Sequence, residues 1–229
     1  MAGSKEKIEV YLEIGKKRVF AGALDWPGWS RSGRDEQSAL QALLEHGPRY
    51  QQIVQKAAPE LKAPVDLSAL EVTERLEGGS TTDFGAPEIP PSVDSTPVTG
   101  KDLERFRSLL QAIWAAYDRA AEAAVGKELR KGPRGGGREL EKITAHVLGS
   151  EAAYLRQLGR KLKLDESAPL EEQLALVRQE ALQALASPPA PDAPTTGPRG
   201  GKLWTQRYFV RRSAWHILDH AWEIENRIE

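Results

Sequence analysis

The chain of 229 residues contains no cysteine. This absence excludes disulfide bonds, thiolate metal ligands and a cysteine nucleophile, so any thiol chemistry must use a sulfur atom that a cosubstrate supplies. Long apolar runs are lacking too: none approaches the roughly 20 residues that a membrane-spanning helix requires, so no membrane partner is expected. The start, Met1 to Lys7, leads into an alternating pattern and not into the apolar core of an export signal, which favours the cytoplasm.

An excess of charge of either sign is also lacking, because 32 basic residues face 33 acidic ones. Without a strong positive field, nucleic acid is not the expected partner. Histidine is scarce, with four in the whole chain. What the chain does contain is 40% apolar residues, enough for a buried core, and a length that suits one large domain or two modest ones.

Residues 1–77 predict a small α+β module. Apolar residues alternate over 8–14, which is typical of a strand with one buried face. A hairpin turn over 15–17 is then expected to lead into a second strand over 19–24. This pattern differs from that of the rest of the chain, so the sequence predicts a separate unit at the N-terminus.

The remainder of this module predicts helix and then a returning strand. Asp35 is the expected N-cap of a helix, which Gly47 and Pro48 should end before another short helix begins. Apolar residues over 70–76 indicate a third strand. The predicted order is strand, strand, helix, strand.

Residues 22–40 contain the run Gly-Ala-Leu-Asp-Trp-Pro-Gly-Trp. The expected helix that follows begins with the acidic residues Asp35 and Glu36. This stretch resembles the HicB-like module, whose second strand runs through a Pro-Gly turn into a helix opened by acidic residues. The resemblance implies a partner-recognition role for residues 1–77. The alternative is that Trp26 and Trp29 simply cover one end of a small sheet, as aromatic side chains commonly do.

Residues 78–100 are rich in proline and glycine, which predicts a semi-stiff linker. Beyond them, apolar residues recur at spacings of three and four, as in amphipathic helices, and Thr99 is the expected cap of the first. Such stripes are buried most economically in an all-α four-helix bundle over residues 101–229, so the protein should be mainly α overall. The stripes cover residues 103–120, 140–158, 170–185 and 210–228.

Three of the four histidines fall on these predicted helices. His216 and His220 are four residues apart, so both imidazoles lie on one helical face, at the edge of the apolar stripe. His146 lies at the edge of another stripe and is a candidate third ligand. Three nitrogen ligands leave coordination positions for water or substrate, which is the pattern of a catalytic zinc site. His46 precedes Gly47 at the expected helix end and is interpreted as structural.

The segments 144–155 and 213–220 are similar, in order and placement, to the DinB/YfiT-like superfamily of metalloenzymes. These are four-helix bundles with one ligand histidine on the second helix and a His-x-x-x-His pair on the fourth. The resemblance implies His146, His216 and His220 as ligands of a divalent metal, Zn, Ni or Fe. It also implies a small-molecule substrate and a low-molecular-weight thiol as cosubstrate, because characterised relatives include thiol-dependent transferases and an isomerase. The N-terminal module departs from the family's one-domain pattern.

A metal bound to these histidines would act as a Lewis acid that activates water or a small thiol for hydrolysis or transfer. Glu151, Asp219 and Glu223 are the nearby candidates for a base or for an acceptor behind a ligand, and Tyr154 is a candidate hydrogen-bond donor. Asp219 lies furthest from the apolar stripe and is the least favoured of the three. The predicted catalytic residues are Glu151 and Tyr154. The alternative for each acidic residue is an ordinary surface charge.

Two loops, 132–138 and 197–202, combine Pro-Arg with a glycine run just before a histidine-bearing helix. Free backbone N–H groups beside Arg134, Arg138 and Arg199 would suit a carboxylate or phosphate. The alternative is a mobile connector. The up-down-down-up arrangement of the DinB-like family would place the two loops at opposite ends of the bundle.

Tyr208, Trp215 and Trp222 recur every seven residues, away from the apolar stripe of their helix. Such a row of aromatic side chains needs cover, so we expect it to dock the N-terminal module or a second subunit, the latter giving a dimer. The competing hypothesis for the whole protein is a non-catalytic binding protein, in which the bundle has lost activity and the N-terminal module recognises a partner.

Overall fold

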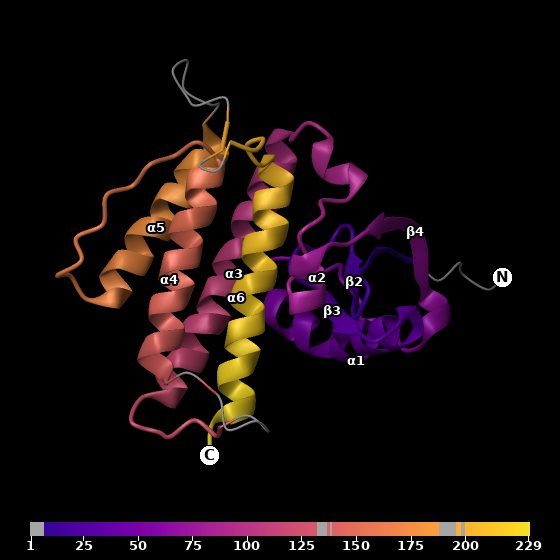
Figure 1. The fold of residues 1–229 in the computed structure, drawn as a ribbon, viewed down its shortest axis with the longest axis horizontal. Helices are drawn as coiled ribbons and strands as arrows, with labels where there is room; N and C mark the ends of the chain where they lie inside the picture. The colour runs from indigo at the N-terminus through magenta and orange to yellow at the C-terminus, as the bar shows by residue number, and fades with distance from the viewer. Residues whose placement is uncertain (1–6, 132–136, 138, 188–195, 198–199) are drawn as a thin grey trace. The chain divides into compact units, whose positions relative to one another are not determined.

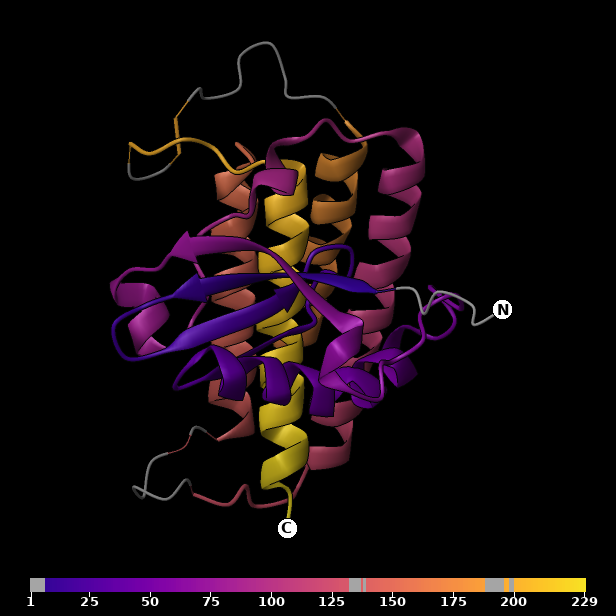
Figure 2. The same cartoon turned by 90° about the vertical axis from the view of Figure 1, so that its right-hand side faces the viewer.

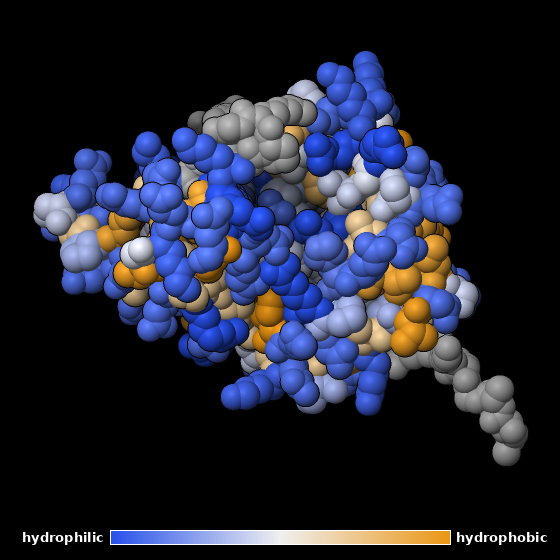
Figure 3. All heavy atoms as spheres, turned by 90° about the horizontal axis from the view of Figure 1, so that it is seen from below, coloured by the Kyte–Doolittle hydropathy of each residue, from blue (hydrophilic) through white to orange (hydrophobic). Residues whose placement is uncertain are grey.

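The computed structural model describes residues 7–131, 137, 139–187, 196–197 and 200–229 (Figure 1). The chain divides into two compact units, Met1–Pro97 and Val98–Glu229. The first is an α+β unit and the second is helical, so the fold class is α+β and mainly α, as predicted. Hydrophilic side chains cover most of the face seen in Figure 3. Within the described ranges, no helix has the length and apolarity that crossing a membrane requires.

The N-terminal unit is built on one sheet (Figure 2). Its strands are β1 (Ile8–Ile14), β2 (Val19–Ala23), β3 (Ser30–Gly33) and β4 (Leu70–Glu77). They lie in the order β3-β2-β1-β4, with β1 antiparallel to β2, β2 antiparallel to β3, and β1 parallel to β4. Helix α1 (Glu36–Val54) packs against β2 and β3. Strand β3 was not predicted, because its sequence Ser-Arg-Ser-Gly has no apolar alternation.

Gly47 and Pro48 do not end the helix, so this prediction was wrong. Helix α1 continues through Pro48 to Val54. Two carbonyl groups in the turn before the proline receive side-chain contacts: the Trp29 indole donates to the Leu43 carbonyl at 2.9 Å, and a His46 ring nitrogen lies 3.0 Å from the Ala42 carbonyl. Pro48 has no N–H, so the carbonyl that loses its helical donor is that of Leu44, and the two contacts lie just before that break in the hydrogen-bond pattern. His46 is therefore inside a helix and not at its end.

The segment predicted as a linker is largely part of the N-terminal unit, which extends to Pro97. It contains the short helix α2 (Ser80–Phe84) and a 3-10 turn over Ser92–Ser95. Glu13 on β1 is fully buried and accepts hydrogen bonds from the Thr82 hydroxyl and from the backbone N–H groups of Glu88 and Ile89. Burial raises the pKa of Glu13, and these hydrogen bonds oppose that shift. This buried carboxylate, together with Glu74 on β4, which accepts from Ser92, attaches the segment to the sheet.

The C-terminal unit contains the four predicted helices. They are α3 (Gly100–Ala124), α4 (Leu140–Gln157), α5 (Leu170–Ala186) and α6 (Gln206–Arg227). Thr99 caps α3 as predicted, because its hydroxyl accepts from the Asp102 N–H while the Asp102 carboxylate accepts from the Thr99 N–H. The predicted stripes supply much of the fully buried core, including Leu110, Ile113, Ile143, Val147, Val210, Ala214, Ile217, Ala221 and Ile224.

Helices α3 and α6 run in one direction, and α4 and α5 run in the other (Figure 1). Arg207 at the start of α6 pairs with Asp102 at the start of α3, at 2.7 Å. The Trp204 N–H, just before α6, donates to the carbonyl of Gln157 at the end of α4. The chain therefore crosses the bundle in an up-down-down-up order. In this arrangement α4 and α6 are in contact.

Candidate metal centre

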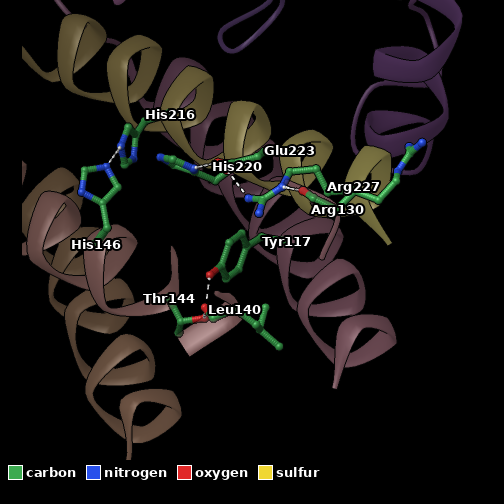
Figure 4. A network of polar contacts seen from close by, with 9 residues as sticks. All are labelled: Tyr117, Arg130, Leu140, Thr144, His146, His216, His220, Glu223 and Arg227. Atoms are coloured by element: carbon green, nitrogen blue, oxygen red, sulfur yellow. Dashed lines mark hydrogen bonds and ion pairs between the residues drawn. The ribbon is translucent and has the colours of Figure 1, made fainter. Parts of the chain in front are cut away.

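His146 on α4 and His216 and His220 on α6 come together in the bundle (Figure 4). The Nε2 atoms of His146 and His216 are 3.2 Å apart, and each of the three rings offers a nitrogen atom within 4.8 Å of the others. His216 and His220 are buried, and His146 is half-buried. The three predicted ligands therefore lie close enough to bind one metal ion.

The local sequence explains how α6 presents its two histidines. Ile217 and Ala221 are fully buried in the core, and each histidine is the residue directly before one of them. At 100° per residue, both imidazoles therefore point to the edge of the core, where α4 packs. His46 belongs to the N-terminal unit and is not part of the cluster.

The geometry of the cluster suits a small divalent ion. Nitrogen ligands at Zn–N distances of 2.0–2.1 Å in a tetrahedral site lie about 3.3 Å apart, close to the 3.2 Å between His146 and His216. The His220 ring is nearly perpendicular to both other rings, at 79° and 78°. Imidazole nitrogen suits Zn, Ni and Fe alike, and three ligands leave positions for a small molecule.

Glu223 orients one of the ligands. His220 Nδ1 lies 2.8 Å from Glu223 Oε2, and because a carboxylate only accepts, the Nδ1–H donates and Nε2 is left as the lone-pair nitrogen. Arg227 donates to the other oxygen of Glu223 at 2.7 Å and to the carbonyl of Arg130 at 2.8 Å (Figure 4). The hydrogen bond from His220, together with Arg227, lowers the pKa of Glu223. Glu223, one of the sequence candidates for an acceptor behind a ligand, is therefore in contact with a histidine of the cluster.

We expect Glu223→Gln to lower the affinity for Zn²⁺ by about tenfold, because an amide is a weaker acceptor and holds the His220 tautomer less firmly. The measurement is a Zn²⁺ titration of the full chain against a competing chelator. Glu225→Gln serves as the control, since Glu225 is exposed on the same helix. Equal affinities for the two variants would contradict the role assigned to Glu223.

Tyr154, one of the two predicted catalytic residues, lies beside the cluster. Its ring meets the His216 ring edge-on at a centroid distance of 5.6 Å and contacts the Trp204 ring at 5.1 Å. Burial raises the pKa of Tyr154, and the nearby Arg212 guanidinium opposes that shift. The phenol therefore keeps its proton at neutral pH and is available as a hydrogen-bond donor.

Glu151, the other predicted catalytic residue, has its partners on different helices. Its buried carboxylate accepts from the Trp114 indole of α3 at 2.7 Å and lies 3.5 Å from Arg178 Nε of α5. Both partners lie on helices other than α6, which carries His216 and His220. Arg178 also pairs with Asp118 at 2.8 Å. Burial raises the pKa of Glu151 to about 6. Its contacts join α3, α4 and α5, so we interpret it as a packing residue.

The remaining sequence candidates are Asp219 and the three arginines of the two glycine-rich loops. Asp219 is not part of the cluster. Arg134, Arg138 and Arg199 lie outside the described residues, so their contact with an anion stays a prediction. The helices that follow the two loops begin at opposite ends of the bundle, because α4 and α6 run in opposite directions.

The aromatic row of α6 is buried: Tyr208, Trp215 and Trp222 are each less than a tenth exposed. Two contacts come from within the C-terminal unit, because the Trp204 ring meets Tyr208 at 4.8 Å and the Arg212 guanidinium lies 4.5 Å from the centre of a Trp215 ring. Neither Trp204 nor Arg212 was singled out in the sequence, since a lone tryptophan in a loop and one arginine on a charged helix carry no distinctive pattern. Docking of the row against another surface stays a prediction.

Comparison of the chain with protein-family models, with curated proteins and with solved structures finds no match. The assignment of function therefore depends on the geometry of the histidine cluster and its surroundings.

Proposed function

We propose that this protein is a metal-dependent enzyme of the DinB-like class, in which His146, His216 and His220 bind a divalent cation, Zn, Ni or Fe. The observation that carries the proposal is the convergence of three imidazole nitrogens within 4.8 Å of one another. A cation held there supplies Lewis-acid chemistry, lowering the pKa of water or of a small thiol for hydrolysis or transfer. The thiol must come from a cosubstrate, because the chain has no cysteine.

The surrounding residues support a reactive site more than a purely structural one. Glu223 fixes the tautomer of His220, as carboxylates do behind ligand histidines. Tyr154 places a protonated phenol ring beside His216, where it can donate a hydrogen bond to a bound small molecule. Within the part of the chain that the structure describes, the cluster offers three protein ligands and not the four of a closed structural zinc site.

The experiment that tests the proposal is Co²⁺ loading of the metal-free full chain, followed by titration with 2-mercaptoethanol. We expect about one equivalent of Co²⁺ to bind, and the thiol to produce a sulfur-to-cobalt charge-transfer band in the near ultraviolet. Co²⁺ binding without any thiol-dependent band would exclude the thiol-dependent reaction. Failure to bind Co²⁺ or Zn²⁺ would exclude the metalloenzyme and favour the non-catalytic binding protein.

A further inference from the structure

Arg212 lies on α6 one helical turn before His216 and forms no ion pair with any described carboxylate. Its Nη1 atom is buried and has no hydrogen-bond partner. The guanidinium lies between two aromatic side chains, 5.4 Å from the centre of the Tyr154 ring and 4.5 Å from that of a Trp215 ring. Burying a charged N–H donor without a hydrogen-bond acceptor costs free energy of folding. Native structures therefore rarely contain such a donor unless it has a function.

Other arginines of the same bundle show what is missing at Arg212. Arg207 lies 5.5 Å from the Phe106 ring and still pairs with Asp102 at 2.7 Å. Arg178 lies over the Trp114 ring and pairs with Asp118, although its Nη2 atom, like Arg212 Nη1, is buried without a hydrogen-bond partner. In both cases the aromatic contact accompanies a carboxylate and does not replace it. Among the described residues, Arg212 has the two aromatic contacts and no carboxylate partner.

Tyr154 connects this arginine to the histidine cluster, because its ring contacts both the Arg212 guanidinium and the His216 ring. Arg212 and His216 are four residues apart on one helix, which is about 6 Å along the helix axis. A small molecule of roughly three carbons spans that distance. One end of such a molecule would meet the guanidinium while the other end meets the histidines.

We propose that Arg212 binds the carboxylate group of the small molecule that reacts at His146, His216 and His220. Tyr154 and Trp215 hold the planar guanidinium in place, and Nη1 donates to a carboxylate oxygen. One guanidinium balances one negative charge, whereas a phosphate dianion would leave a second charge uncompensated among aromatic rings. This assignment rests on the proposed function and names the substrate class: a short carboxylate with its reacting group at the far end.

The first test uses metal-free full chain and propionate as the probe, with propan-1-ol as the neutral control. The indole N–H signal of Trp215, assigned in the ¹H–¹⁵N NMR spectrum with Trp215→Phe, reports binding. We expect propionate, but not propan-1-ol, to shift this signal saturably. In Arg212→Gln the affinity should fall at least about tenfold, the effect of losing one charged hydrogen bond. Arg207→Gln is the matched control, because Arg207 already has a carboxylate partner.

Arg212→Lys is a second variant that keeps the charge in case the glutamine variant does not fold. It loses the planar pair of donors, so it should bind propionate more weakly than the native chain but better than Arg212→Gln. A native protein whose Trp215 signal does not respond to propionate would overturn the proposal. So would folded Arg212 variants that bind propionate as well as the native chain does.

The second test separates this proposal from the proposed function. On Co²⁺-loaded protein we expect 3-mercaptopropionate to bind at least about tenfold more tightly than 3-mercaptopropan-1-ol, and Arg212→Gln to abolish that preference. Equal binding of both thiols, with no propionate response, would leave the metal site intact and overturn the role of Arg212. A propionate response without any thiol band would support the carboxylate site and contradict the thiol-dependent reaction.

Discussion

Replacing His216 and His220 together by alanine is expected to abolish stoichiometric Zn²⁺ binding. The native chain, purified without a histidine tag and dialysed against metal-free buffer, should hold about one Zn²⁺ by elemental analysis, and the double variant none. The physical reason is that α6 supplies two of the three nitrogen ligands, and the remaining His146 cannot hold the ion alone. Zn²⁺ should also raise the melting temperature of the native chain and leave that of the variant unchanged.

His46→Ala is the matched control for this experiment, because His46 is the one histidine outside the cluster and its ring contacts the Ala42 carbonyl within α1. It should retain Zn²⁺ like the native chain. Circular dichroism must show that the double variant is helical, since both of the replaced side chains are buried. Zn²⁺ retained by the folded double variant would mean that the ion binds elsewhere. A native chain that takes up no Zn²⁺ would leave the histidines as core residues.

The second large effect is expected for the pH dependence of stability on replacing Glu151 by glutamine. Burial raises the pKa of Glu151 to about 6 from an ordinary value of 4.5. The folded chain therefore binds this proton more tightly than the unfolded chain. The contribution of Glu151 to stability is fully present below about pH 4.5 and is lost as the pH rises through 6.

A shift of this size corresponds to about 2 kcal/mol in the free energy of unfolding. Glutamine does not titrate and can still accept from the Trp114 indole. The stability of Glu151→Gln relative to the native chain should therefore rise by about 2 kcal/mol between pH 4 and pH 7. The measurement is urea unfolding at a series of pH values, followed by helical circular dichroism.

Glu141→Gln removes a carboxylate from an exposed position of the same helix and is the control for the loss of one charge. If the stability difference between Glu151→Gln and the native chain were independent of pH, the carboxylate of Glu151 would not be desolvated as its contacts with Trp114 and Arg178 indicate. A separate Zn²⁺ titration of Glu151→Gln shows whether Glu151 serves only packing. In that case the Zn²⁺ affinity of the variant should equal that of the native chain.

The sequence by itself was sufficient for features that depend on residues close together in the chain. The spacing of apolar residues predicted the four helices of the bundle, and the alternation over 8–14 predicted β1. Thr99 and Asp102 form their capping box within one turn. His216 and His220 share a helix face for the same reason. Each of these depends on backbone geometry repeating every two or every 3.6 residues, which a single sequence displays directly.

The tertiary structure alone decided which distant residues meet. The sequence favoured Glu151 over Glu223, yet Glu151 contacts Trp114 and Arg178 while Glu223 contacts His220. Pro48 lies inside α1, where Trp29 and His46 contact the carbonyls before it.

Arg212 is a further example, because the absence of a carboxylate partner for it among the described residues depends on the side chains that the packing places around it. The local pattern determines the type of each element and its apolar stripe, because both follow from the chain's own periodicity, but it did not show that Glu13 and the aromatic row of α6 are buried as well. Partners from elsewhere in the chain determine what each polar group on that face does, because the cost of burying a charge depends on the groups that the packing brings to it.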